Sequence, residues 1–439
     1  MVEKRKNYTG ADSEGGITSS YETGDGVQLK VPYSFFGSIY DQEEEQAALK
    51  AMHQDKLTMG PNVTAFQKAF AEKHGVKHAF AVSNCTTGMH LCTQLFDIGP
   101  GDEVIVTPNT FIATSLVILK ERAKPVYADI DPRTFNIDPK EIEKKITRRT
   151  KAIYVVHYGG LMCDMDPIMA LAKKHKLYVL EDCAHAHNAE YKGRKAGSIG
   201  DVGVFSFHSL KNMTTLGEGG MITTNHDKWA EKIEALRCMN LDQWRAGQKR
   251  WKFGPHVLEK KTRYDYWIPS HFDVNDVNGH WGNNYRMNEV QAAVGICQVK
   301  KLDMLTEKRR EIGHAITAGI SGIKGVTPVY EPEGYKHVFH LYTVCIEEEE
   351  LGASRDDFMR VLYLEEGVQG ILHYQPTYHF TGLKKLGIKG NCPNAEKFFY
   401  KREFNLPMHP RLTPQQVDDI IQGIRRAAEK VRSGYRIKG

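Results

Sequence analysis

The sequence lacks the features that mark membrane and secreted proteins. None of its apolar runs approaches the roughly 20 residues that a helix needs to span a bilayer. Residues 1–26 are polar and rich in glycine and serine, without the apolar core of a secretory signal. We therefore expect a cytoplasmic protein with no membrane partner.

Cysteines are few and unclustered. The chain has eight, and no two of them form a C-x-x-C pair. Zinc sites and disulfide frameworks in small proteins depend on closely spaced cysteines. We expect reduced, buried thiols and no metal site.

A strong charge of either sign is also missing. The chain has 59 Lys and Arg against 54 Asp and Glu, a net charge of +5, and its basic pairs are scattered among acids. Nucleic-acid binders usually carry a clustered basic stripe, so we expect no nucleic-acid partner. A G-x-G-x-x-G motif after the first strand is absent too, which argues against a Rossmann dehydrogenase.

Short apolar runs alternate with helical patterns through the first half of the chain. This alternation favours an α/β fold with a mostly parallel, seven-stranded sheet flanked by helices. The predicted strands are 78–83, 103–107, 124–128, 151–156, 177–180, 202–206 and 220–224.

The second half predicts a small C-terminal α+β domain. A long helix is expected from about 289 to 320, a strand over 338–346, and helices over 355–365 and 414–431. We predict a flexible N-terminal arm at 1–30, a large domain at 31–285 with an aromatic-rich insert at 238–283, and a long helix with the small domain at 286–439.

A lysine lies in a Gly/Ser/Thr-rich loop between two predicted strands. The stretch from Phe205 to Gly220 places Lys211 after Ser206, which ends a strand. Most loop lysines are solvated. A lysine that is buried instead loses solvation of its charged form, and its amine becomes a better nucleophile towards a carbonyl. This is what a Schiff-base lysine requires.

Two other strands end in polar residues. Asp182 follows the apolar run at 177–180, and the C-terminal ends of parallel strands are where α/β sheets bind ligands. A buried carboxylate there needs a cationic partner; the alternative is a helix cap or a surface acid. Asn84 follows the first strand and is a natural N-cap, leaving the amides of Cys85 and Thr86 to bind a phosphate.

Phe111 follows the strand at 103–107, where its ring either stacks on a flat heterocycle or joins the core. Together with the segments around Lys211, Asp182 and Asn84, this pattern resembles the DegT/StrS group of sugar aminotransferases. These are fold-type I enzymes that depend on pyridoxal 5'-phosphate (PLP). The resemblance spans roughly residues 30–432.

The resemblance assigns a role to each residue. It implies that Lys211 forms the Schiff base with PLP, that Asp182 pairs with the pyridine nitrogen, and that His185 lies near the phenolic oxygen. These three are the expected catalytic residues. The remaining cofactor contacts it implies are the amides of Cys85 and Thr86 and the hydroxyl of Ser206 on the phosphate, Phe111 over the ring, and Asn284 reaching the phosphate of a neighbouring subunit.

That last contact implies a homodimer with shared active sites. The sequence also departs from the family pattern. Cys85 replaces the usual glycine, which makes the phosphate loop bulkier, and Leu216 is an extra residue in the lysine loop. The insert at 238–283 either contacts a substrate or extends the dimer interface.

The implied reaction moves an amino group from L-glutamate or L-glutamine to a ketone on a nucleotide-linked keto-sugar, by a ping-pong mechanism. One alternative is a cyclitol ketone of the scyllo-inosose type as acceptor. Another is a PLP-binding sensor or regulatory protein. A PLP-dependent sugar dehydratase is disfavoured, because such relatives carry histidine in place of Lys211 or extra cysteines for an iron–sulfur cluster.

Overall fold

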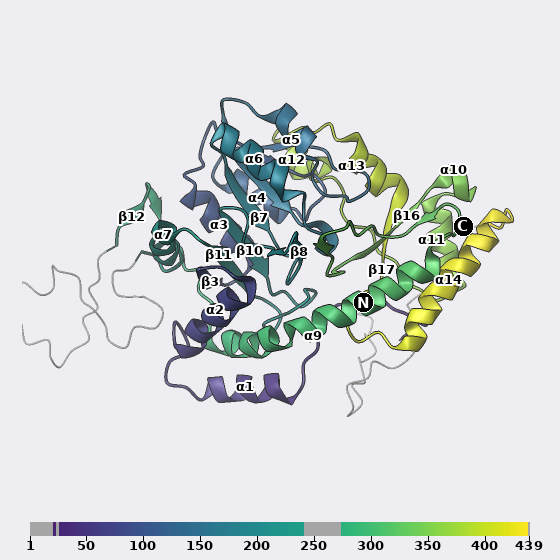
Figure 1. Cartoon of the computed structure of the whole chain (residues 1–439), viewed down its shortest axis with the longest axis horizontal. Coiled ribbons are helices and arrows are strands. Elements are labelled where there is room, and N and C mark those ends of the chain that lie inside the picture. Colours follow the sequence, from purple (N-terminus) through teal and green to yellow (C-terminus); the bar gives the residue numbers. More distant parts are fainter. Residues whose placement is uncertain (1–20, 23–25, 241–273, 438–439) are drawn as a thin grey trace, which may run out of the picture.

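A seven-stranded sheet forms the centre of the molecule (Figure 1). The structure, a computed structural model, describes residues 21–22, 26–240 and 274–437. The strand order is β3-β11-β10-β7-β6-β4-β5, and only β11 runs against the others. The strands are β3 (His78–Val82), β4 (Glu103–Val106), β5 (Lys124–Tyr127), β6 (Thr150–Val156), β7 (Tyr178–Asp182), β10 (Val202–Ser206) and β11 (Gly220–Thr224). The predicted seven-stranded, mostly parallel sheet is confirmed.

Helices cover both faces of this sheet, because its strands are apolar on both sides. Every residue from Ala152 to Val156 in β6 is buried, as expected for a parallel strand between two layers. One apolar core lies under α3, α4 and α7, and the other under α2, α5, α6 and the start of α9. The bounds are α2 (Pro61–His74), α3 (Cys85–Leu95), α4 (Ala113–Lys120), α5 (Pro139–Lys145), α6 (Met165–His175) and α7 (Asp227–Arg237).

The long helix α9 (Glu289–Ile320) joins this layer to a smaller unit (Figure 1). Its first half packs on α1 (Gln42–Met52) and α2, and its end joins a third apolar core. That core contains the three-stranded sheet β14 (Val326–Thr327), β16 (Tyr342–Ile346) and β17 (Glu403–Leu406), with helices α11 (Arg355–Leu364) and α14 (Pro414–Arg432). The remaining short helices are α10 (Glu348–Leu351), α12 (Thr381–Lys385) and α13 (Pro393–Lys397).

The proposed domain boundaries stay predictions. Residues 1–20 of the predicted arm and 241–273 of the predicted insert lie outside the described residues. The two ends of the insert meet, since the amide of Met239 donates to the carbonyl of Asn283 at 2.9 Å. Short paired strands complete the fold: β1 (Tyr21–Glu22) with β2 (Gln28–Leu29), β12 (Asp276–Val277) with β13 (His280–Trp281), and β15 (Tyr335–Lys336) with β8 (Glu190–Tyr191) and β9 (Arg194–Lys195).

The strand predicted over 338–346 is wrong in its first half, because β16 begins only at Tyr342. Tertiary contacts hold the preceding residues in another shape. Val338 donates to the carbonyl of Gly160, Leu341 donates to that of Gly159, and Phe339 has a positive φ of 44°. An irregular segment therefore reaches the centre of the molecule from the small unit.

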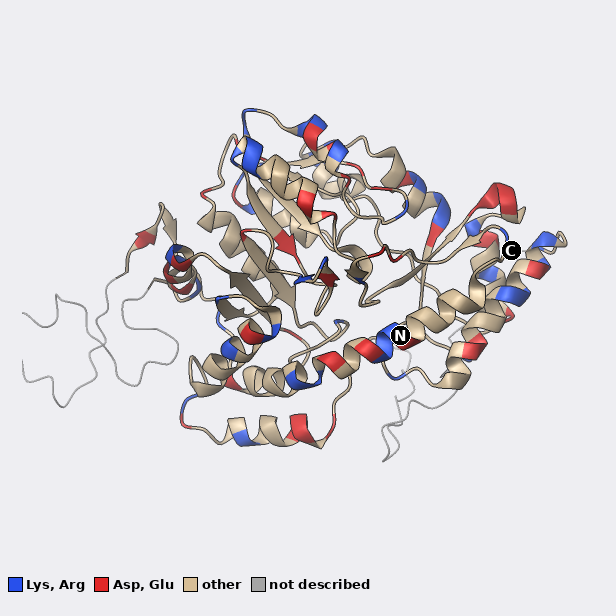
Figure 2. Ribbon diagram, viewed as in Figure 1, with Lys and Arg blue, Asp and Glu red and all other residues tan. Residues whose placement is uncertain are grey.

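The long helices α9 and α14 carry surface charge of both signs. Blue and red residues alternate along α9 and α14 (Figure 2), a pattern typical of helices with one face in water. Within the described ranges, no helix is long and apolar enough to cross a bilayer.

Candidate active site

The loop between β10 and β11 holds Lys211 in a tightly bonded turn. Phe207 donates to the carbonyl of Gly219 at 2.8 Å and accepts from Thr215 at 3.1 Å, while Ser209 donates to Gly217 at 3.1 Å. Gly219 is required here, because a Cβ atom would lie 2.1 Å from the hydroxyl of Thr215. The lysine therefore projects from a fixed support and not from a loose loop.

The segment 37–40, which we call the strap, packs on this loop from the N-terminal side of the chain. The amide of Gly37 donates to the carbonyl of Ser209 at 2.8 Å, and the hydroxyl of Tyr40 accepts from the amide of Leu216 at 2.8 Å. Leu216, the extra residue of the loop, has a positive φ of 59°. The insertion is thus accommodated by a left-handed turn whose amide is satisfied by Tyr40.

The Lys211 amine is in an environment that favours its neutral form. Desolvation by burial lowers its pKa below the ordinary value of 10.5, and the nearby negative charge of Asp182 opposes this shift. Burial wins, so the free amine is more available as a nucleophile than in a solvated lysine. The solvated alternative raised by the sequence is excluded.

Asp182 ends β7 and is 4% exposed. One carboxylate oxygen, Oδ1, accepts from the amide of Ala184 at 3.1 Å; the other, Oδ2, accepts from the hydroxyl of Thr114 at 2.9 Å. Desolvation by burial is the largest effect and raises the pKa of Asp182 above 3.8, although these two donors and the charge of Lys211 act to lower it. The buried carboxylate is thus a position where a cation is strongly favoured.

His185 lies beside two other aromatic side chains from the small unit. Its ring stacks on His340 with centroids 4.2 Å apart, and Nε2 is 3.3 Å from the hydroxyl of Tyr374. The amide of Gly159 donates to its Nδ1 at 3.4 Å, so Nε2 carries the proton in the neutral ring. Burial lowers the pKa of His185 well below 6.5, and the charge of Lys211 lowers it further.

The start of α3 has the geometry of an anion site. Asn84 is its N-cap and accepts from Thr87 at 2.9 Å in a capping box, as predicted. The amides of Cys85 and Thr86 precede the first helical hydrogen bond, which runs from Gly88 to Asn84. β11 approaches this helix start closely, since a Cβ on Gly220 would lie 2.8 Å from the amide nitrogen of Cys85.

The remaining predicted cofactor contacts are Ser206, Phe111 and Asn284, and they differ in burial. Ser206 ends β10 and is 7% exposed. Phe111 is 60% exposed and lies edge-on to Tyr374 at 6.4 Å, so the core alternative for this ring is wrong. Asn284 is exposed and pairs with Cys238 in an isolated bridge. Its predicted reach to a second subunit stays a prediction.

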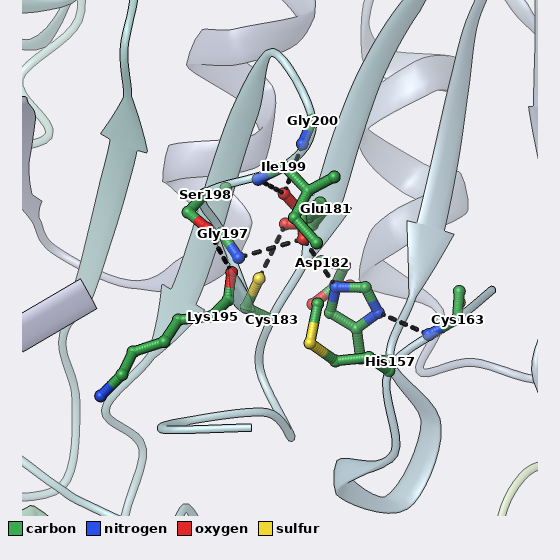
Figure 3. A network of polar contacts seen from close by, with 12 residues as sticks. His157, Cys163, Glu181, Asp182, Cys183, Lys195, Gly197, Ser198, Ile199 and Gly200 are labelled. Atoms are coloured by element: carbon green, nitrogen blue, oxygen red, sulfur yellow. Dashed lines mark hydrogen bonds and ion pairs between the residues drawn. The ribbon is translucent and has the colours of Figure 1, made fainter. Parts of the chain in front are cut away.

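Directly behind Asp182, a polar network fixes the end of β7 (Figure 3). Glu181, the neighbouring residue, points to the opposite face of the sheet. Its carboxylate accepts from Gly197, Ile199 and Gly200 at 2.6–3.0 Å and from Nε2 of His157 at 2.9 Å. These contacts hold its pKa below 4.5 despite full burial.

This network is the arrangement closest to a metal site among the described residues. Ligand atoms of His157, Glu181 and Cys183 lie within 4.8 Å of one another. Each is already engaged. Nδ1 of His157 accepts from Cys163 at 3.1 Å, the four bonds to Glu181 use its lone pairs, and the thiol of Cys183 donates to the carbonyl of Glu181 at 3.5 Å. The group therefore supports β7 and leaves no ligand atom free for an ion.

The sequence-based interpretation did not identify Thr114 or His157 as part of this region, and it gave Glu181, the neighbour of Asp182, no role. Thr114 lies four residues after Thr110 and three after Phe111. Helical spacing could therefore have predicted that Thr114 lies on the same side as these two residues. Nothing in the sequence signals the partners of Glu181, because they come from two separate segments, the loop at 197–200 and His157.

The arrangement fits the three parts of PLP. The buried Asp182 carboxylate suits a protonated ring nitrogen, the Lys211 amine suits an aldehyde carbon, and the start of α3 with Ser206 suits a phosphate. These groups come from β7, β10, α3 and the lysine loop, which meet at the C-terminal edge of the sheet. Such an edge is the usual ligand site of an α/β fold.

Known proteins share both this sequence and this fold. The spore coat polysaccharide biosynthesis protein SpsC of Bacillus subtilis is 38% identical over 405 residues, covering 90% of this chain and 96% of that protein. The GDP-perosamine synthase of Caulobacter vibrioides is 37% identical over 391 residues, covering 88% and 95%.

Among solved structures, Helicobacter pylori PseC, an aminotransferase involved in the biosynthesis of pseudoaminic acid, superimposes with a TM-score of 0.79. The two chains are 28% identical, and the match covers 91% of this chain and 99% of PseC. Residues 38–425 match the DegT/DnrJ/EryC1/StrS aminotransferase family. The chain belongs to this family and is a PLP-dependent aminotransferase.

Proposed function

We propose that this enzyme transfers an amino group from L-glutamate or L-glutamine to the ketone of a nucleotide-linked keto-sugar, in two half-reactions. The observation that carries the proposal is that the half-buried Lys211 and the buried Asp182 carboxylate lie near each other at the C-terminal edge of the sheet, each acting on the pKa of the other. Support for the acceptor comes from a relative whose name specifies a GDP-linked sugar.

In the proposed mechanism Lys211 has two tasks. Its amine, whose pKa burial lowers below 10.5, holds the aldehyde carbon of the cofactor. Displaced by the amino donor, the same amine would remove a proton from the donor's α-carbon as a base and, as an acid, return it to the carbon that was the aldehyde carbon of the cofactor. PLP, when bound, supplies a ring that accepts the electrons of the deprotonated carbon. The carboxylate of Asp182 stabilises the positive ring nitrogen that this requires.

The side chains around Lys211 favour an uncharged, hydroxyl-rich group, such as the sugar ring of the acceptor. Burial lowers the pKa of His185 and His340 well below 6.5 and that of His373 to about 4. Neutral imidazoles and the Tyr374 hydroxyl both donate and accept hydrogen bonds, which suits hydroxyl and keto oxygens. Within the part of the chain that the structure describes, the buried Nδ1 of His373 has no hydrogen-bond partner. A sugar oxygen is the partner that we propose for it.

We propose a homodimer in which each site is completed by the second subunit. Phe111 presents 60% of its surface and Leu216 48%, and both belong to segments that build the site. Exposed apolar side chains beside a site are typical of an interface. Asn284, exposed on the same chain, is the residue that we propose reaches the partner's phosphate.

The first test is covalent trapping. Holoenzyme treated with borohydride should retain the cofactor on the peptide that contains Lys211, as located by mass spectrometry. Lys211→Ala should retain none, while the control Lys68→Ala, at a side chain 78% exposed, should behave as wild type. Label on another lysine would refute the assignment.

The second test identifies donor and acceptor. L-glutamate or L-glutamine should bleach the visible band of the holoenzyme, and a nucleotide-linked keto-sugar should restore it. Restoration by a free cyclitol ketone alone would favour the cyclitol alternative. A bound cofactor that no donor bleaches would favour the sensor alternative.

A further inference from the structure

Three donors from three elements surround the carboxylate of Asp182. The amide of Ala184 and the thiol of Cys85 approach Oδ1 at 3.1 and 3.9 Å, and the hydroxyl of Thr114 approaches Oδ2 at 2.9 Å. Ala184 follows β7, Cys85 opens α3, and Thr114 lies in the first turn of α4. The charge of this buried carboxylate therefore depends on groups outside its own strand.

Thr114 is the stronger of the two side-chain donors to Asp182, Thr114 and Cys85. Its hydroxyl also lies 2.9 Å from that of Thr110 and 3.4 Å from the carbonyl of Phe111. An ionised carboxylate can only accept, so the Thr114 proton points at Asp182 and Thr110 donates to Thr114 in turn. Both threonines are buried, at 0% exposure for Thr114 and 2% for Thr110.

Cys85 contributes less. Its Sγ lies closer to the carbonyl of Val204, at 3.7 Å, than to Asp182, and a single thiol proton serves one acceptor at a time. Thiols are also weak donors. If a side chain keeps Asp182 ionised, Thr114 is the one with the geometry to do so.

We propose that Thr114 is a positioning residue that keeps Asp182 ionised and aimed at the ring nitrogen of the cofactor. This inference rests on the proposed function, since it assigns the partner of Asp182. Without the hydroxyl, Oδ2 loses its one donor, and burial then favours the neutral acid. A neutral Asp182 pairs poorly with a protonated ring nitrogen.

The test compares Thr114→Val, which keeps the side-chain shape, with Thr114→Ser, which keeps the hydroxyl. The dissociation constant for PLP is measured by equilibrium dialysis on apoprotein, and kcat and KM on holoenzyme. Thr114→Val should weaken PLP binding and lower kcat by roughly tenfold to a hundredfold each, the range for a hydrogen bond to a charged group. KM for the amino donor should change little, and Thr114→Ser should restore most of both losses.

Thr93→Val is the matched control. Thr93 is a buried threonine on α3 whose hydroxyl bonds to Met89 and Tyr154 and not to Asp182. Its removal should lower stability without changing PLP affinity or kcat. Equal losses of PLP affinity and kcat in both valine variants, or no loss in Thr114→Val, would refute the role of Thr114 and leave the proposed function standing. Wild-type protein that binds no PLP would refute this inference together with the proposed function.

Discussion

Replacing Gly37 with alanine tests whether the strap fixes the lysine loop. A Cβ at this position would lie 2.2 Å from the carbonyl oxygen of Leu210 and 2.4 Å from that of Lys211. Both contacts are with backbone atoms, so no flexible side chain can rotate away. Either the strap or the loop has to move by about an ångström to reach ordinary contact distance.

The cost follows from what this movement breaks. Overpacking in a close-packed interior costs about 1–3 kcal/mol. The strap also places the Gly37 carbonyl 2.6 Å from Nη2 of Arg309, and the Gly37 amide bonds to Ser209. Loss of one such bond adds about 1 kcal/mol. We expect Gly37→Ala to lower the free energy of unfolding by about 2–4 kcal/mol.

Urea unfolding of the apoprotein measures this loss, and equilibrium dialysis measures PLP affinity in parallel. Affinity should fall as well, because the atoms that clash belong to Lys211 and its neighbour. Gly99→Ala is the control, since its Cβ would meet no atom within 4 Å. An alanine variant at position 37 with wild-type stability and affinity would show that the loop does not depend on the strap.

Three further predictions concern buried or capping groups. Lys211→Met apoprotein should have a higher free energy of unfolding than wild type at pH 7, because the lowered pKa of Lys211 means that the folded state holds this proton less tightly than the unfolded state. Urea titrations should show this difference in free energy shrinking as the pH rises towards 10.5. Glu181→Gln should cost at least about 3 kcal/mol in urea unfolding at pH 7, against no change for the exposed Glu218→Gln. Folding lowers the pKa of Glu181, so its contribution to the free energy of unfolding is present above pH 4.5 and is lost as the pH falls through the pKa of the folded state. The difference in stability between wild type and Glu181→Gln should therefore shrink in acid. Asn84→Ala should cost about 1 kcal/mol of thermal stability through its lost cap, and a variant as stable as wild type would contradict that role.

The central sheet was predictable because each strand is a short apolar run bounded by turn residues. The helix α7 was equally visible, since Trp229, Ile233 and Leu236 recur at helical spacing, and the interpretation omitted it. The segment before β16 was not predictable. Val338 and Phe339 read as strand, yet they bond to Gly160 and to Arg309, residues far away in the sequence.

The candidate site divides in the same way. Asp182 ends a recognisable strand, Asn84 begins a helix directly after one, and Lys211 lies in the loop that follows another, so local pattern predicts that they lie at one edge of the sheet. The lowered pKa of His185 depends on its burial, to which the stacked ring of His340 contributes, and on the neighbouring charge of Lys211. Those contacts exist only once the small unit packs against the large sheet, and no spacing rule encodes them.

Cys85 shows how a local expectation changes once the fold is known. Replacing a glycine beside the predicted phosphate site suggested a bulkier loop. In the structure the thiol is 7% exposed and lies against Val204 and Asp182, so its volume is taken up by the core beneath the helix start. Burial raises the pKa of Cys85 well above 9, which keeps the thiol protonated. Cys85 therefore leaves the helix amides available and adds a weak donor to the Asp182 carboxylate, the group proposed to pair with the ring nitrogen.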